Sequence, residues 1–128
     1  PLMMLVVSSE ENMRNLEQIR TDHLKSIGLM SGAPTTKTRP SVIWMSYNVH
    51  GNEATNSAAF PKVLHELLAG GAVADKILKN AIVILAPCLN PDGHDRYVNW
   101  YNQKVGVTAN ANTMLPSGSP MRCAITSA

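Results

Sequence analysis

The sequence predicts an α/β fold: a mixed, mainly parallel sheet with helices on both faces. Two apolar runs, residues 42–47 and 81–86, are apolar enough to be central strands, and the second is continuous, which suits a strand that is covered on both faces. Segments with a helical period of apolar residues precede and separate these runs. Because such an alternation is typical of right-handed crossovers between parallel strands, we expect the two runs to be neighbouring or near-neighbouring central strands.

Composition and charge indicate one globular domain. The chain has 128 residues, 45% of them hydrophobic, and a formal net charge of +2. Its Lys and Arg residues are scattered rather than arranged in a stripe, so we expect no nucleic-acid partner. The apolar run 2–7 is too short to span a membrane and lacks the flanks of a signal peptide. Two cysteines, Cys88 and Cys123, make no disulfide framework.

The N-terminal part predicts a strand, a helix and a loop. Residues 2–7 suit an edge or core strand. The two serines before residue 10 can cap a helix over residues 10–27, because hydroxyl oxygens accept from the free N–H groups of a first turn. Gly28 ends the helical pattern. Residues 31–40, which are rich in Thr, Pro and Gly, predict a loop.

Two helices are predicted between the two central strands. A helix over residues 56–69 has an apolar face, and Pro61 falls inside it. Either this helix starts near Pro61, which suits a first turn, or it is kinked there. Two glycines end it, and a short helix covers residues 73–79. After the second central strand, residues 94–104 can form a further helix with its aromatic residues on one side.

A pair of candidate metal ligands follows the first central strand. His50 comes just after the apolar run, Gly51 breaks the strand pattern, and Glu53 lies three positions beyond the histidine. A tight turn at this spacing can bring an imidazole and a carboxylate to one point, at the strand end where sites in α/β sheets lie. Both groups are standard zinc ligands, and a catalytic zinc needs three protein ligands and one open position.

A second motif strengthens this interpretation. Asn90-Pro91-Asp92-Gly93 follows the other central strand, 40 positions after His50. The order of strand, His-x-x-Glu, helix, strand and Asn-Pro-Asp-Gly resembles the zinc carboxypeptidase (metallocarboxypeptidase) family. The amino-acid sequence of the second motif and the nine residues after it is similar to sequences of a bacterial branch of that family.

The resemblance implies a zinc-dependent hydrolase that cleaves a peptide or amide bond at a chain end with metal-activated water. It implies Zn²⁺ as cofactor, with His50 and Glu53 as ligands, and a structural turn beside the site at residues 90–93. It also implies a peptide or small amide substrate and favours a secreted or periplasmic location. Residues 1–105 would be the N-terminal portion of an incomplete catalytic domain. Residues 106–128 have no usable period and predict a flexible tail.

Parts of the family's machinery have no counterpart in this sequence. Its second ligand His, its carboxylate-gripping Asn-Arg segment and its catalytic Glu lie beyond the matching region. Arg96 is the nearest candidate for the arginine that stabilises the oxyanion, although a plain surface arginine is an equal interpretation. Asn52 stands where well-known members often have Arg. We therefore expect a fragment that is inactive alone and that self-associates through an exposed sheet edge.

Several alternatives stay open at this point. His94 can be proposed as a substitute third ligand, and Asp95 as the group that orients His50. Asp92 can instead serve the turn by bonding its own backbone. The alternative functions are a non-catalytic binding or scaffold domain that keeps half a metal site, and a related zinc-dependent deacylase. A downstream His and Glu in the native gene would distinguish an enzyme from a scaffold.

Overall fold

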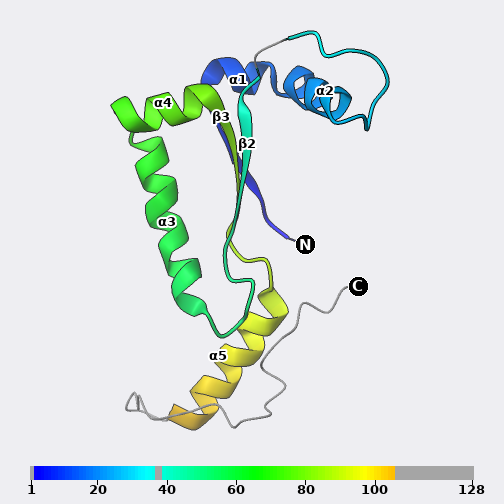
Figure 1. Cartoon of the computed structure of the whole chain (residues 1–128). Helices are drawn as coiled ribbons and strands as arrows, with labels where there is room; N and C mark the ends of the chain where they lie inside the picture. Colours follow the sequence, from blue (N-terminus) through cyan, green and yellow to red (C-terminus); the bar gives the residue numbers. More distant parts are fainter. Residues whose placement is uncertain (1, 37–38, 106–128) are drawn as a thin grey trace. The chain divides into compact units, whose positions relative to one another are not determined.

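The computed structural model describes residues 2–36 and 39–105. In chain order its elements are β1 (Leu5–Val7), α1 (Glu10–Arg14), α2 (Leu16–Ser26), β2 (Ser41–Ser46), α3 (Ala54–Leu68), α4 (Ala72–Asn80), β3 (Ala81–Ala86) and α5 (Pro91–Val105), as Figure 1 shows. The predicted tail 106–128 lies outside the described residues.

The chain divides into two compact units, each described here by itself. The sheet unit comprises Met4–Met45 and Val63–Leu85. The turn unit comprises Pro1–Met3, Ser46–Lys62 and the segment from Ala86 onward. The strands β2 and β3 and the helix α3 run from one unit into the other, so each unit is built from segments that are distant in sequence.

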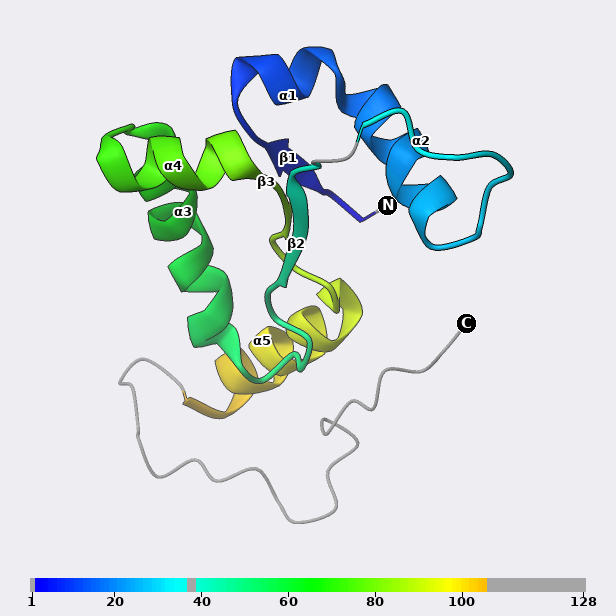
Figure 2. The ribbon, with the colours of Figure 1, turned by 45° about the horizontal axis from the view of Figure 1, so that its top comes forward.

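The three strands form one sheet in the order β1-β3-β2, which Figure 2 shows from a second direction. β1 runs antiparallel to β3, with Leu5 opposite Leu85 and Val7 opposite Val83. The α/β class is therefore confirmed and the sheet is mixed, but the prediction that it is mainly parallel is wrong. The strand over residues 2–7 is also shorter than predicted, since β1 begins only at Leu5.

Hydrogen bonds after β1 explain its antiparallel direction. The Ser8 hydroxyl lies 3.0 Å from the carbonyl oxygen of Leu78 and 2.6 Å from that of Ala81, and the Ser9 N–H donates to the same Leu78 oxygen at 3.0 Å. The Asn12 side chain also donates to the Leu78 oxygen, at 3.0 Å. The last carbonyls of a helix lack intrahelical partners, so α4 offers acceptors here. The end of β1 is thereby held at the start of β3.

The two predicted central strands differ in burial. β3 has the predicted bounds and lies in the core, with Val83 2% and Leu85 0% exposed. β2 neighbours β3 as expected but is an edge strand, and its Val42, Ile43 and Trp44 are 48%, 40% and 54% exposed. The prediction of a buried central strand at residues 42–47 is wrong in this respect. An apolar composition indicates that the side chains of a strand are suited to burial. It does not show that other described residues bury them.

The helices differ from the predictions mainly at their ends. The single helix predicted over residues 10–27 is divided into α1 and α2 at Asn15, whose side chain donates to the Glu11 carbonyl at 3.1 Å. Such side-chain bonds to the backbone compete with helix geometry. α3 starts at Ala54 and continues through Pro61, so the alternative start near Pro61 is wrong. Within the described ranges, no helix is long and apolar enough to cross a membrane.

A buried carboxylate fixes the loop after α2. Asp22 is fully buried in the sheet unit, and its oxygens accept the N–H groups of Thr35 and Thr36 at 2.9 and 3.1 Å. They also accept both threonine hydroxyls at 2.8 Å and the Gln18 amide at 3.1 Å. These bonds, led by the one from the Thr35 N–H, hold the pKa of Asp22 well below its ordinary value although burial acts in the other direction.

We expect Asp22→Asn to lower the free energy of unfolding at neutral pH, because an amide cannot accept all of these donors. The folded-state pKa lies below the ordinary value of 3.8, so the charged carboxylate stabilises the fold above about pH 4. That contribution is lost as the pH falls through the folded-state pKa. Denaturant midpoints of the wild type and of Asp22→Asn, measured between about pH 7 and pH 2, check this. The difference between the two midpoints should become smaller as the pH falls.

The matched control is Glu66→Gln, which removes an exposed carboxylate from α3 of the sheet unit. Its midpoint should follow that of the wild type across the pH range. A gap for Asp22→Asn that stays constant down to the lowest pH would contradict the assigned role, since the difference would then not depend on the charge of Asp22.

Candidate functional site

The chain changes direction directly after β2. The Tyr47 N–H donates to the Ala86 carbonyl at 3.0 Å, and the Leu89 N–H donates to the Tyr47 carbonyl at 2.9 Å. Asn48 follows with a φ of 51°, a left-handed conformation that Asn adopts more readily than most residues. This residue therefore starts the turn that presents His50. We call residues 48–53 the His50 turn.

The two candidate ligands share this turn. The Glu53 N–H donates to the His50 carbonyl at 3.0 Å, so the predicted i,i+3 spacing is realised as one tight turn. Both side chains are exposed, and Glu53 directly precedes α3. The Asn56 amide nitrogen lies 3.5 Å from a carboxylate oxygen of Glu53.

The Asn-Pro-Asp-Gly motif forms the start of α5. Asn90 occupies the N-cap position: its Oδ1 accepts the Gly93 N–H at 3.0 Å, and its carbonyl accepts the His94 N–H at 3.1 Å. Pro91 is the first helical residue, where a missing N–H costs nothing, and Asp92 places a negative charge in the first turn. The side-chain bond to the backbone suggested for Asp92 is thus made by Asn90, and the helix starts three residues earlier than predicted. We call residues 90–93 the α5 cap.

Two glycines bring the His50 turn against the α5 cap. A Cβ atom on Gly51 would lie 2.0 Å from the carbonyl carbon of Gly93 and 2.5 Å from the backbone nitrogen of His94. A Cβ atom on Gly93 would lie 2.6 Å from the side-chain nitrogen of Asn90. Because the Gly51 separations are to backbone atoms and are shorter than van der Waals contact allows, position 51 requires glycine, whereas a side chain at position 93 would displace the Asn90 amide. From the sequence alone, Gly51 was only a strand breaker.

Asn90 also joins the two segments by hydrogen bonds. Its backbone N–H donates to the Asn48 carbonyl at 3.2 Å, and its side-chain Nδ2 donates to the Val49 carbonyl at 3.1 Å. One side chain therefore caps α5 with its oxygen and holds the peptide before His50 with its nitrogen. A short-range sequence pattern could identify the cap, but it could not identify this contact with a segment that is distant in sequence.

Buried polar groups lie at the start of the His50 turn and directly before it. Asn48 is 0% exposed, and its Nδ2 lies 3.3 Å from the sulfur of Cys88, which is half-buried. The Asn48 Oδ1 and the Tyr47 hydroxyl are buried and have no hydrogen-bond partner among the described residues. The Tyr47 ring packs edge-on against Phe60, with ring centroids 5.6 Å apart. Packing and hydrogen bonds thus order the residues that precede His50.

The other candidates lie on α5. His94 is half-buried, with its Nδ1 3.9 Å from a carboxylate oxygen of its neighbour Asp95, and Arg96 is exposed. In the part of the chain that the structure describes, no three His, Cys, Asp or Glu residues lie close enough together to hold a metal ion. His94 therefore does not complete a ligand set with His50 and Glu53 there.

The donor chemistry of the His50 turn fits zinc in part. An imidazole nitrogen and a carboxylate oxygen are both zinc ligands, and they stand on one turn whose backbone is fixed by hydrogen bonds. A catalytic zinc takes a third protein ligand, which the described residues do not supply. His50 and Glu53 are the residues that would hold the ion.

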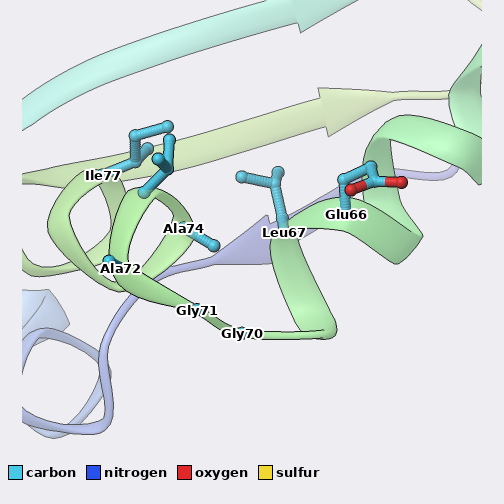
Figure 3. Close-up of a pocket in the computed structure, with 8 residues that line it drawn as sticks. Glu66, Leu67, Gly70, Gly71, Ala72, Ala74 and Ile77 are labelled. Carbon is cyan, nitrogen blue, oxygen red and sulfur yellow. The ribbon is translucent and has the colours of Figure 1, made fainter.

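The sheet unit has a hollow that none of these residues lines. It has a volume of about 320 Å³ and lies between the end of α3 and the start of α4, as Figure 3 shows. Its lining is mainly apolar, and Glu66 is the one ionisable residue among the described residues that form it. None of the candidate ligands borders it, so this hollow is not the predicted site.

Comparison with known proteins supports the resemblance seen in the sequence. The model of the zinc carboxypeptidase family matches residues 1–115. Neither the curated proteins nor the solved structures gave a significant match. Because the family match covers most of the 128 residues, the chain belongs to the zinc carboxypeptidase family.

Proposed function

We propose that this chain forms the N-terminal portion of the catalytic domain of a zinc-dependent metallocarboxypeptidase of a bacterial branch. The observation that carries the proposal is the His50 turn, which places His50 and Glu53 on one backbone turn fixed by the α5 cap. The family match over residues 1–115 supports the same chemistry. Bound zinc would supply the Lewis acid that activates water for attack on an amide carbonyl.

The residues of this chain would contribute ligation and positioning. His50 and Glu53 donate the first two ligand atoms, and the α5 cap holds the turn that carries them. Arg96 is exposed on α5, where its guanidinium is the candidate donor for a developing oxyanion. The substrate we infer is a peptide or a small amide cleaved at a chain end. A secreted or periplasmic location is part of this proposal.

In this proposal, neither the third zinc ligand nor the general base is one of the residues that the structure describes. The described residues contain no group of three metal-binding side chains, and a positioned base typically contributes about 10²–10⁴-fold in rate. We therefore expect the 128-residue chain alone to be inactive. The two-ligand site also favours the alternative of a non-catalytic binding or scaffold domain, which a downstream His and Glu in the native gene would exclude.

We expect the chain to bind zinc weakly, because two ligands are fewer than the three of catalytic sites. His50→Ala and Glu53→Ala should each lower the zinc affinity by at least about 10-fold, because even the loss of a group that only orients a metal ligand lowers metal affinity by about that factor. Titration calorimetry with zinc measures this. His65→Ala, which removes an exposed imidazole from α3, is the matched control and should bind as the wild type does. Tight binding that survives His50→Ala would place the ligands elsewhere.

The chain alone should release no C-terminal residue from peptides in the presence of zinc, since the base and the third ligand are missing from the described residues. An assay on free peptides and on C-terminally blocked peptides checks this expectation. Zinc-dependent release that is abolished by Glu53→Ala would show that both missing groups are in the chain. His94 would then be the first residue to substitute.

A second copy of the chain is the partner we propose for the exposed edge. β2 is six residues long, ends the sheet, and contains no charge or proline that would block pairing with another strand. Such pairing would satisfy the backbone N–H and C=O groups along the open edge of β2. β1, at the other edge, offers only three residues.

Size-exclusion chromatography with light scattering should show a mass that rises with protein concentration. Trp44→Lys should return the chain toward a monomer, because an edge lysine opposes strand addition. Leu29→Lys changes an exposed apolar residue away from the edge and is the matched control. A mass that does not depend on concentration, or that Trp44→Lys leaves unchanged, would refute pairing through β2.

A further inference from the structure

Asn90 makes two different contacts through one side chain, and this points to a role beyond capping. We propose that Asn90 is a positioning residue that orients the His50 turn through the Val49 carbonyl while it starts α5. The inference rests on the proposed function, since the groups that it positions are the candidate zinc ligands His50 and Glu53.

The geometry connects Asn90 directly to the backbone of His50. The Asn90 Nδ2 donates to the Val49 carbonyl at 3.1 Å. That carbonyl and the nitrogen of His50 belong to the same planar peptide unit. Fixing the oxygen therefore fixes the plane from which the His50 side chain departs. The Asn90 N–H adds a second link at the Asn48 carbonyl, 3.2 Å away.

The surrounding glycines make room for this arrangement. The Asn90 amide folds over Gly93, where a Cβ atom would lie 2.6 Å from its nitrogen and 2.8 Å from its oxygen. On the other side, the backbone of Gly93 is in close contact with Gly51 of the His50 turn. The amide thus lies between the Val49 carbonyl to which it donates and the Gly93 N–H from which it accepts.

Capping alone does not explain why the residue is asparagine. Ser, Asp and Asn all cap helices well, because each offers an oxygen that accepts a first-turn N–H. Of the three, only Asn also carries an amide N–H₂ donor, while ionised Asp has acceptors alone. The bond to the Val49 carbonyl uses that donor. The capping role and the positioning role can therefore be separated by substitution.

Asn90→Asp is the variant that separates them, because it keeps the capping oxygen and removes the donor. Amide hydrogen exchange followed by NMR gives one reporter for each role. The Gly93 N–H, which bonds to the Asn90 Oδ1, reports on the cap, and the Glu53 N–H, which bonds to the His50 carbonyl, reports on the turn. We expect the Gly93 amide to exchange no faster than in the wild type. The Glu53 amide should exchange roughly two- to tenfold faster, the effect of losing one ordinary hydrogen bond.

Zinc affinity is the second measurement, and it should fall by roughly 10-fold in Asn90→Asp, as for other groups that orient a ligand. Asn90→Ala removes both roles and should accelerate both amides. Asn80→Asp makes the same chemical change at an asparagine whose amide donates to the Lys76 carbonyl in the sheet unit, and it should change neither reporter. If Asn90→Asp does not fold, Asn90→Ser gives the same test, since its hydroxyl can cap but is too short to replace the amide.

Wild-type exchange at Glu53 together with wild-type zinc affinity in Asn90→Asp would overturn the inference. Equal acceleration of the Gly93 and Glu53 amides in Asn90→Asp would overturn it as well, because the change would then disturb the helix start as much as the turn, and no separate positioning role would remain. Failure of the proposed function gives a different result: zinc binding that is absent in the wild type or unaffected by His50→Ala. In that case the Glu53 amide still decides whether Asn90 orients the turn.

Discussion

The close contact between Gly51 and Gly93 is the constraint on which the turn unit depends. With a virtual Cβ on Gly51 only 2.0 Å from the Gly93 backbone, the separation of the two segments is set by main-chain atoms and not by side chains. Main-chain contacts have no rotamers to choose between, so they define a position more narrowly than side-chain packing does. Binding sites need this, because ligand atoms must be held within about 0.5 Å of their working geometry.

The neighbouring strands β2 and β3 carry the chain into this contact. Beyond the last residues of the strands, backbone bonds continue from Tyr47 to Ala86 and to Leu89, and then from Asn90 to the Asn48 carbonyl. The two segments that leave the strands therefore stay paired until one becomes the His50 turn and the other becomes α5. This is a physical reason why polar residues just after adjacent strands meet, as they do at the strand ends of other α/β sheets.

Sequence reasoning succeeded where the signal was local. The buried run of β3, the cap before α1 and the turn between His50 and Glu53 follow from residues that are adjacent in sequence. It failed where the partner was distant. Nothing near Val42 or Trp44 shows that β2 is an exposed edge, and nothing in the run 2–7 shows that Leu78 will hold its end. The double role of Asn90 was missed for the same reason, since the Val49 carbonyl belongs to another segment.

The backbone of the His50 turn is held by contacts between protein groups among the described residues. Every interaction that holds the turn joins protein groups: the Gly51–Gly93 contact, the cap of α5 and the Asn90 bond to Val49. The backbone entropy of ordering the turn is therefore lost on folding and not on binding a metal. Binding to a preformed turn loses less affinity to backbone ordering. A third ligand from another segment would add its full contribution to the free energy of metal binding. A site divided between distant segments can bind a metal tightly in this way.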